Sequence, residues 1–111
     1  MLKLMIADTA EETRQQLEEA FGAQCAVAAC ADGEMALQLL QQFMPDILVL
    51  DLMLPKVDGL SVLQQLRQSQ LQTMVLALIG VSSPFVLQQL QQLQKLSLIK
   101  STPSSDGVLF A

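Results

Sequence analysis

ILVLDLMLPKVDG, residues 47–59, places one carboxylate, that of Asp51, at the end of an otherwise apolar run. Residues 47–51 have the length and composition of a strand that is buried on both faces. Pro55 and the pair Asp58–Gly59 are typical of the turn that follows such a strand. Because an unpaired charge is costly at the end of a buried strand, Asp51 is predicted to be either a reactive group or the remnant of one.

The rest of the chain alternates apolar runs with segments of helical periodicity. We predict strands at residues 2–7, 24–29, 47–51, 74–79 and 96–100, and helices at about 10–21, 33–43, 60–68 and 84–96. Continuous apolar strands separated by helices indicate a parallel sheet covered on both faces. The predicted fold class is therefore α/β, a doubly wound, five-stranded, flavodoxin-like sheet in a single domain over residues 1–111. A last helix from about Gly107 is expected to be short or truncated, and the natural protein is expected to continue.

Composition excludes several classes of function. Of the 111 residues, 51% are hydrophobic and 15% are charged, which fits one globular domain with a single core. The net charge of −5 and the lack of a basic cluster argue against a direct nucleic-acid-binding surface. Asp46, Asp51 and Asp58 interrupt the longest apolar region, so no membrane span or membrane partner is predicted. The chain has no histidine, which excludes histidine-based acid–base catalysis and zinc sites.

The two cysteines, Cys25 and Cys30, lie in the apolar run CAVAAC. On a strand they would face opposite sides of the sheet at a separation of roughly 16 Å, which is too far for a disulfide. We therefore interpret both as small core residues, and this use of cysteine favours a reducing, cytoplasmic location.

Polar residues follow three of the predicted strands. Asp8 follows the first strand, Asp51 ends the third and Lys100 ends the fifth. The carboxyl ends of parallel strands meet at one edge of the sheet, so these side chains are expected to converge. Two adjacent carboxylates favour a hard cation such as Mg²⁺, and a lysine can pair with Asp51 or with a phosphoryl group on it. A carboxylate nucleophile, a metal ion and a lysine are the parts that phosphoryl transfer needs.

The segment PDILVLDLMLPKVDG, residues 45–59, resembles the phosphoacceptor segment of response-regulator receiver domains of two-component signalling. ADGEMAL, residues 31–37, resembles the start of the second helix in that family. The resemblance extends to about Lys100 and implies the family's strand order, 2-1-3-4-5.

Site residues and partners follow from this resemblance. It implies that Asp51 is the phosphoacceptor, that Lys100 is its partner and that Asp8, Asp51 and the backbone carbonyl of Met53 hold Mg²⁺. The implied phosphodonor is a sensor histidine kinase or a phosphotransfer protein, and an output domain would follow beyond the C-terminus. Such a protein is not an enzyme in the ordinary sense, because at most it catalyses its own phosphorylation.

Three positions depart from the family's pattern. Thr9 stands where the family has a second acidic residue, and its hydroxyl also fits a capping box with Glu12. Ile79 stands at the switch position, where the family has a threonine or serine, and isoleucine has no hydrogen to donate. A looser alignment places Ser82 or Ser83 at the switch position instead. Ser101 stands where a proline normally follows the lysine. The resemblance is therefore to a degenerate receiver, with a weak Mg²⁺ site in which Thr9 is a poor ligand and with an eroded switch.

Four alternatives stay open. The first is a working phospho-receiver that tolerates Thr9 and uses another route to output. The second is a pseudo-receiver that acts independently of phosphorylation as a dimerisation or interaction module. A homodimer through the fourth-helix side is a possible partner, since leucines at three-residue spacing in the predicted helix 84–96 cannot all face the core. A flavodoxin-like cofactor-binding protein is more distant, because no glycine-rich or hydroxyl-rich loop follows the first strand. A hydrolase with Asp51 as nucleophile would need a second carboxylate at position 53, which is Met53.

Overall fold

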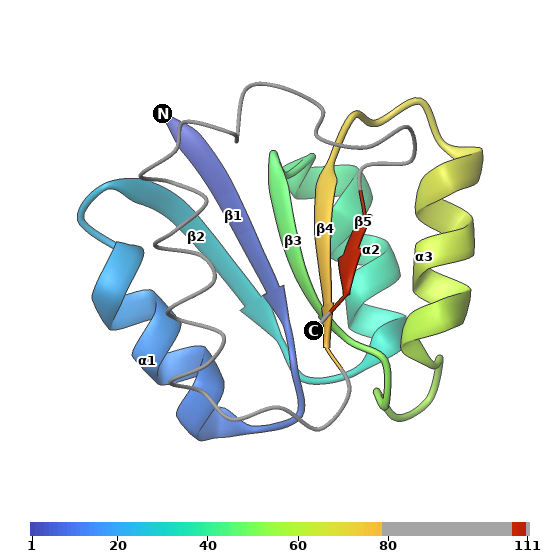
Figure 1. The fold of residues 1–111 in the computed structure, drawn as a ribbon, viewed down its shortest axis with the longest axis horizontal. Coiled ribbons are helices and arrows are strands. Elements are labelled where there is room, and N and C mark those ends of the chain that lie inside the picture. The colour runs from blue at the N-terminus through green and yellow to red at the C-terminus, as the bar shows by residue number, and fades with distance from the viewer. Residues whose placement is uncertain (79–107, 111) are drawn as a thin grey trace.

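A computed structural model of the chain describes residues 1–78 and 108–110 (Figure 1). The described elements, in chain order, are β1 (Leu2–Ala7), α1 (Glu11–Phe21), β2 (Cys25–Cys30), α2 (Gly33–Phe43), β3 (Ile47–Asp51), α3 (Gly59–Gln68), β4 (Met74–Leu78) and β5 (Val108–Phe110). From β1 to β4 these bounds agree with the sequence prediction to within a residue or so, the usual uncertainty of an element's end. The predicted helix 84–96, with its leucine row, lies outside the described residues.

The five strands form one parallel sheet in the order β2-β1-β3-β4-β5. This confirms the doubly wound α/β fold that the sequence predicts, and the order of the first four strands that the resemblance implies. Ala7 pairs with Leu50 and Asp51 pairs with Leu78, so β1, β3 and β4 end at the same edge of the sheet. In this class of fold, ligands bind beyond the carboxyl ends of the strands.

The fifth strand differs from the prediction. Val108–Phe110 pairs with β4, with Val75 beside Val108 and Ala77 beside Phe110. The strand predicted at 96–100 lies outside the described residues, and the short last helix expected from about Gly107 is not formed by residues 108–110. A Val-Leu-Phe run favours the extended conformation. Pairing with β4 supplies its backbone hydrogen-bond partners, whereas a single isolated helical turn is unstable.

The helices cover both faces of the sheet, with α1 on one face and α2 and α3 on the other (Figure 1). Alternate residues of the central strands supply the two halves of the core. One half packs on α1 and includes Leu4, Ile6, Leu17, Phe21, Val49 and Leu76. The other half packs on α2 and α3 and includes Met5, Leu40, Leu48, Leu50, Val62 and Leu66. Burial of both faces explains why these strands are continuously apolar.

Two details of the packing bear on the sequence interpretation. Cys25 and Cys30 are free, buried and in opposite halves of the core, as predicted. The helical periodicity of α2 predicts that Met35 and Leu40 both face the core, but Met35 is 50% exposed while Leu40 is buried. That prediction for Met35 was wrong because α2 buries a narrower stripe, based on Gly33, Ala36 and Leu40.

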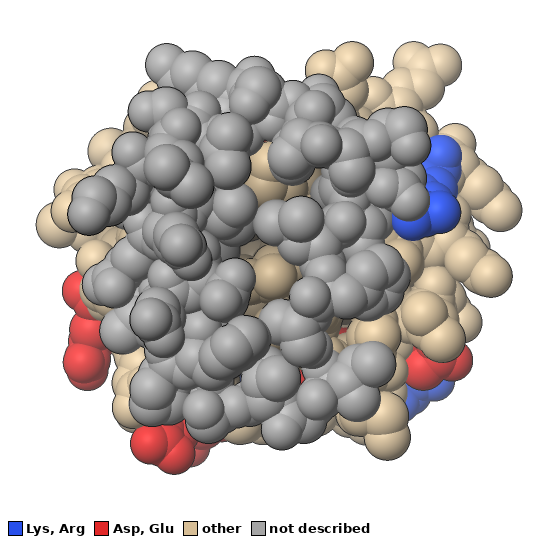
Figure 2. Space-filling view, viewed as in Figure 1, with Lys and Arg blue, Asp and Glu red and all other residues tan. Residues whose placement is uncertain are grey.

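Acidic and basic side chains are both visible on the described part of the face that Figure 2 shows. Figure 2 shows acidic side chains towards the lower margin of one face and the visible basic side chains on the right. The described part of that face has no basic patch, which agrees with the net charge of −5. Among the described residues, no helix has the length and apolar character needed to cross a membrane.

Candidate functional site

Asp51 is the last residue of β3 and is 9% exposed. The backbone N–H of Met53 donates a hydrogen bond to Asp51 Oδ1 at 2.8 Å. The hydroxyl of Thr9 donates to Asp51 Oδ2 at 3.2 Å. Both carboxylate oxygens therefore have a donor from the chain, and the orientation of the Asp51 side chain is defined.

Asp8 lies immediately after β1 and is 7% exposed. Its backbone N–H donates to the carbonyl of Cys30 at 3.1 Å, which continues the β1–β2 pairing to the end of the sheet. Its side-chain Oδ1 accepts a hydrogen bond from the N–H of Ala10 at 2.8 Å. The backbone of Asp8 is thus hydrogen-bonded to the sheet, and its carboxylate is hydrogen-bonded to Ala10, the N-cap residue of α1.

The two carboxylates are coupled electrostatically. Burial raises the pKa of the Asp8 carboxyl above its ordinary value, and the charge of Asp51 raises it further. The hydrogen bond from Ala10 and the charge of Arg14 act in the opposite direction, but the pKa stays raised. A nearby cation would stabilise the ionised form of this pair, because it would offset both the burial and the mutual repulsion.

Thr9 does not cap α1. The N-cap residue is Ala10, with no side-chain capping bond, and α1 begins at Glu11. The capping-box prediction for Thr9 was therefore wrong: the helix starts too late for Thr9 to be its N-cap, and the Thr9 hydroxyl donates instead to Asp51, 42 residues further along the chain.

Arg14 is a site residue that the sequence interpretation missed. Its Nη1 donates to the backbone carbonyl of Asp8 at 2.6 Å, and the contact is partly buried. Arg14 lies one helical turn after Ala10, whose carbonyl accepts the Arg14 N–H at 3.2 Å. The available signal was that Arg14 is the one Lys or Arg in the sequence between residues 4 and 55.

Two glycines hold the loop that follows Asp51. A Cβ atom added at Gly59 would lie 2.5 Å from the carbonyl oxygen of Asp51, and the Gly59 N–H donates to the Leu52 carbonyl at 3.2 Å. A Cβ atom at Gly33 would lie 1.6 Å from the carbonyl oxygen of Val57, and the Gly33 N–H donates to the Pro55 carbonyl at 3.1 Å. The ADG and PKVDG segments of the sequence therefore pack directly against each other.

An ion pair joins the same two segments. Lys56 has a positive φ of 69°, and its Nζ lies 3.7 Å from Asp32 Oδ2. The Asp32 carboxylate also caps α2 by accepting the Met35 N–H at 2.7 Å. These contacts fix the loop that carries Met53, a residue that is 71% exposed.

The structure brings together four of the six predicted site residues: Asp8, Thr9, Asp51 and Met53. Lys100 and Ile79 lie outside the described residues, so their roles stay predictions. No cluster of three or more His, Cys, Asp and Glu side chains suited to a metal occurs in residues 1–78 and 108–110. Two carboxylates and neutral oxygens nevertheless fit a largely hydrated Mg²⁺ ion, which is commonly bound through one or two carboxylates.

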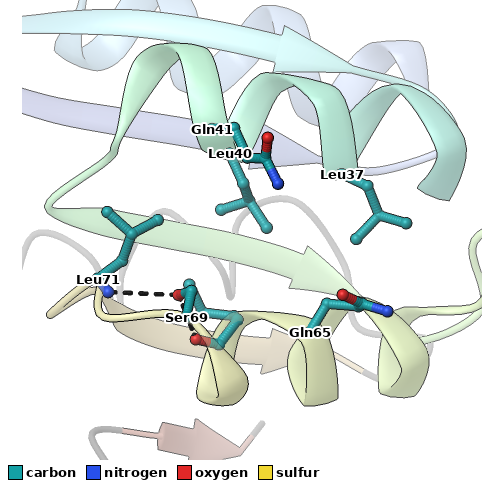
Figure 3. Close-up of a pocket in the computed structure, with 7 residues that line it drawn as sticks. Leu37, Leu40, Gln41, Gln65, Ser69 and Leu71 are labelled. Atoms are coloured by element: carbon teal, nitrogen blue, oxygen red, sulfur yellow. Dashed lines mark hydrogen bonds between the residues drawn. The ribbon is translucent and has the colours of Figure 1, made fainter.

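A separate hollow of about 230 Å³ lies between α2 and α3 (Figure 3). Leu37 and Leu40 project into it from α2, opposite Gln65, Ser69 and Leu71. It lies near the C-terminal ends of both helices, whereas the first residue of α3, Gly59, packs against Asp51. Its lining has no titratable side chain, so it is not part of the carboxylate site.

Comparison with known proteins identifies the family. Residues 4–102 match the family model of the response regulator receiver domain. The chain belongs to this family, and it is a receiver domain of the kind found in two-component response regulators. The resemblance noted in the sequence is confirmed. Receiver domains are generally not enzymes; they interact with histidine kinases or phosphotransfer proteins, and they are joined to output domains.

Individual relatives agree with this assignment. The chain is 44% identical over 59 residues to the alkaline phosphatase synthesis transcriptional regulatory protein PhoP of Bacillus subtilis, covering 53% of this chain and 25% of that protein. It is 36% identical over 72 residues to the probable C4-dicarboxylate response regulator DctR of Priestia megaterium, covering 65% and 31%. The matches thus span about a third or less of these relatives' length.

Solved structures show the same fold. The receiver domain of the Francisella response regulator 1452 has a TM-score of 0.68 and 26% identity, covering 99% of this chain and 84% of that one. The N-terminal domain of the Wolinella succinogenes protein WS1339 has a TM-score of 0.73 at 18% identity, covering 91% and 100%, and supports the fold alone.

Proposed function

We propose that Asp51 accepts a phosphoryl group from a phosphohistidine on a sensor histidine kinase or a phosphotransfer protein, and that the domain regulates its output through protein–protein contacts. One observation carries this proposal. The Asp51 carboxylate is held at the carboxyl end of a buried strand, by Thr9 and Met53, beside the carboxylate of Asp8. A defined carboxylate at the ligand-binding edge of the sheet suits nucleophilic attack on phosphorus.

In the proposed reaction, a carboxylate oxygen of Asp51 attacks the phosphorus atom and the phosphorus–nitrogen bond to the donor imidazole breaks. The products are an aspartyl phosphate and a histidine that takes up a proton. Mg²⁺, when bound, would neutralise the phosphoryl oxygens and the two carboxylates. Asp8, Asp51 and the backbone carbonyl of Met53 would hold it weakly, with Thr9 as a doubtful neutral ligand, and Lys100 would pair with the phosphoryl group.

Output from this site is proposed to be weak or rewired. Thr9 removes one carboxylate from the metal site, and Ile79 removes the hydroxyl that would contact the phosphoryl group. A ligand shifts a conformational equilibrium only through contacts that differ between the two states. With those contacts reduced, the domain is proposed to be a degenerate receiver that occupies residues 1–111 of a longer cytoplasmic protein and precedes an output domain.

A second candidate function is a pseudo-receiver that acts as an interaction module without phosphorylation. The hydrogen bond from Thr9 to Asp51 favours it, because the acceptor carboxylate is satisfied by a neutral group of the chain itself. A homodimer through the fourth-helix side would be one form of such a module, and it predicts a concentration-dependent molar mass in analytical ultracentrifugation.

The two functions are separated by incubating the protein with Mg²⁺ and beryllofluoride and recording backbone amide NMR spectra. Phosphoacceptance predicts shifts at the amide of Met53, which donates to Asp51, and the loss of these shifts in Asp51→Asn. Asp46→Asn is the matched control, since Asp46 is an exposed carboxylate just before the opposite end of β3, bonded to the N–H of Lys3. Unchanged spectra at saturating Mg²⁺ and beryllofluoride would contradict phosphoacceptance.

A further inference from the structure

Two side chains, one just after β1 and one in the first turn of α1, donate hydrogen bonds to Asp51 and to the backbone of Asp8. Thr9 donates its hydroxyl to Asp51 Oδ2 at 3.2 Å. Arg14 donates Nη1 to the backbone carbonyl of Asp8 at 2.6 Å, and its charge opposes the repulsion that Asp8 experiences. One residue therefore contacts the Asp51 side of the pair and the other holds a positive charge on the Asp8 side.

These contacts resemble in kind what a divalent cation supplies to two carboxylates. A cation orients the oxygens and offsets their charge. The Thr9 hydroxyl orients one oxygen of Asp51, and the N–H of Met53 orients the other. The charge of the Arg14 guanidinium offsets part of the repulsion at Asp8. The Thr9 hydroxyl therefore has a contact of its own at a position where the family has an acidic residue.

We propose that Thr9 and Arg14 act as a built-in substitute for part of the cation, which keeps the Asp8–Asp51 pair ordered when no divalent ion is bound. They are positioning residues, because they act through the two carboxylates. This inference rests on the proposed function for its biological meaning. It concerns the unphosphorylated site and involves no phosphoryl transfer. It predicts that the order of the carboxylate pair depends little on Mg²⁺, and that this independence is lost when the Thr9 hydroxyl or the Arg14 charge is removed.

The direction in which Mg²⁺ affinity changes when Thr9 is replaced distinguishes this role from that of a metal ligand. If the Thr9 hydroxyl is a ligand, Thr9→Val weakens Mg²⁺ binding. If it substitutes for the cation, Thr9→Val leaves Asp51 with one donor fewer, and Mg²⁺ binds at least as tightly as in the wild type. Thr9→Asp, which adds a third carboxylate, should tighten Mg²⁺ binding on the order of tenfold. Thr9→Ser keeps the hydroxyl and should restore wild-type behaviour.

Charge at Arg14 is tested in the same titration. Arg14→Met should tighten Mg²⁺ binding several-fold, because it removes a unit positive charge that repels the divalent ion. Arg14→Lys keeps the charge and should remain near wild type. Arg67→Met is the matched control, because it removes the same charge from the last turn of α3, at the far end of that helix from Asp51. Its Mg²⁺ affinity should change less than twofold.

The measurement is an NMR titration of the full chain with MgCl₂ at fixed ionic strength, followed at the amide of Met53, with thermal unfolding recorded at each Mg²⁺ concentration. The result expected is tighter binding and a larger Mg²⁺-dependent rise in Tm for Thr9→Asp and Arg14→Met. Weaker binding in Thr9→Val, or equal changes in Arg14→Met and Arg67→Met, would overturn the proposal. Beryllofluoride binding is measured separately, so the proposed function can fail while this inference stands, and the reverse.

Discussion

Replacement of Gly33 by alanine provides a quantitative test of how the acceptor loop is held. Gly33 is the first residue of α2, where alanine would ordinarily stabilise the helix by up to about 1 kcal/mol. Here, however, the added Cβ would lie 1.6 Å from the Val57 carbonyl oxygen and 2.5 Å from its carbonyl carbon. The contacted atoms are backbone, so rotation of a side chain cannot relieve the clash, and the 55–57 loop must move by more than an ångström.

That movement has a cost that exceeds the gain in helix propensity. It breaks the 3.1 Å hydrogen bond from the Gly33 N–H to the Pro55 carbonyl, worth about 1 kcal/mol. It also overpacks a close contact, at a cost of about 1–3 kcal/mol. We therefore expect Gly33→Ala to lower the free energy of unfolding by roughly 2 kcal/mol and the Tm by roughly 10 °C.

The assay is urea unfolding followed by far-UV circular dichroism, because the chain has no Trp or Tyr to report by fluorescence. Gln38→Ala is the matched control, since Gln38 is an exposed residue of the same helix and its replacement should change stability by less than about 0.5 kcal/mol. A Gly33→Ala protein as stable as the wild type would refute the close packing of Gly33 against the 55–57 loop.

Three further predictions concern single side chains. Asp58→Ala removes the α3 N-cap that accepts the Ser61 N–H at 2.8 Å, and urea unfolding should show a loss of about 1 kcal/mol. Asp8→Asn should stabilise the protein at neutral pH: the raised pKa of Asp8 means that ionisation costs stability above that pKa, and the gain should vanish as the pH falls below the ordinary carboxyl value of 3.8. No difference between the unfolding curves at pH 7 would contradict this. Burial raises the pKa of the Cys30 thiol to about 11, so iodoacetamide at pH 8 should leave Cys30 unmodified in the native protein, as mass spectrometry can verify.

The sequence predicted the sheet well because its strands are buried on both faces. The short, continuous apolar runs at β1, β3 and β4 alternate with helical segments, and this pattern fits buried strands of a parallel sheet. The convergence of Asp8 and Asp51 follows from the parallel topology alone. The spacing of residues did not predict the contact between Gly33 and the 55–57 loop, which explains why a glycine is needed at position 33.

Other features depended on tertiary contacts that a linear pattern does not contain. Thr9 fits a capping box as well as it fits a bond to Asp51, and only the point at which α1 begins decides between them. Arg14 lies in the first helix, and its contact with the Asp8 carbonyl is set by side-chain direction rather than by spacing. The fifth strand was predicted at 96–100, yet 108–110 is also a short apolar run, and periodicity over so few residues cannot rank the two.

The most direct test of phosphoacceptance at Asp51 is to trap the acyl phosphate on the chain. The protein is incubated with Mg²⁺ and a small phosphodonor and then reduced with borohydride, which converts an aspartyl phosphate into homoserine, and the modified residue is located by peptide mass spectrometry. Phosphoacceptance at Asp51 predicts homoserine at position 51 in the wild type and none in Asp51→Asn. Homoserine at another aspartate, or none in the wild type at saturating Mg²⁺ and donor, would contradict it.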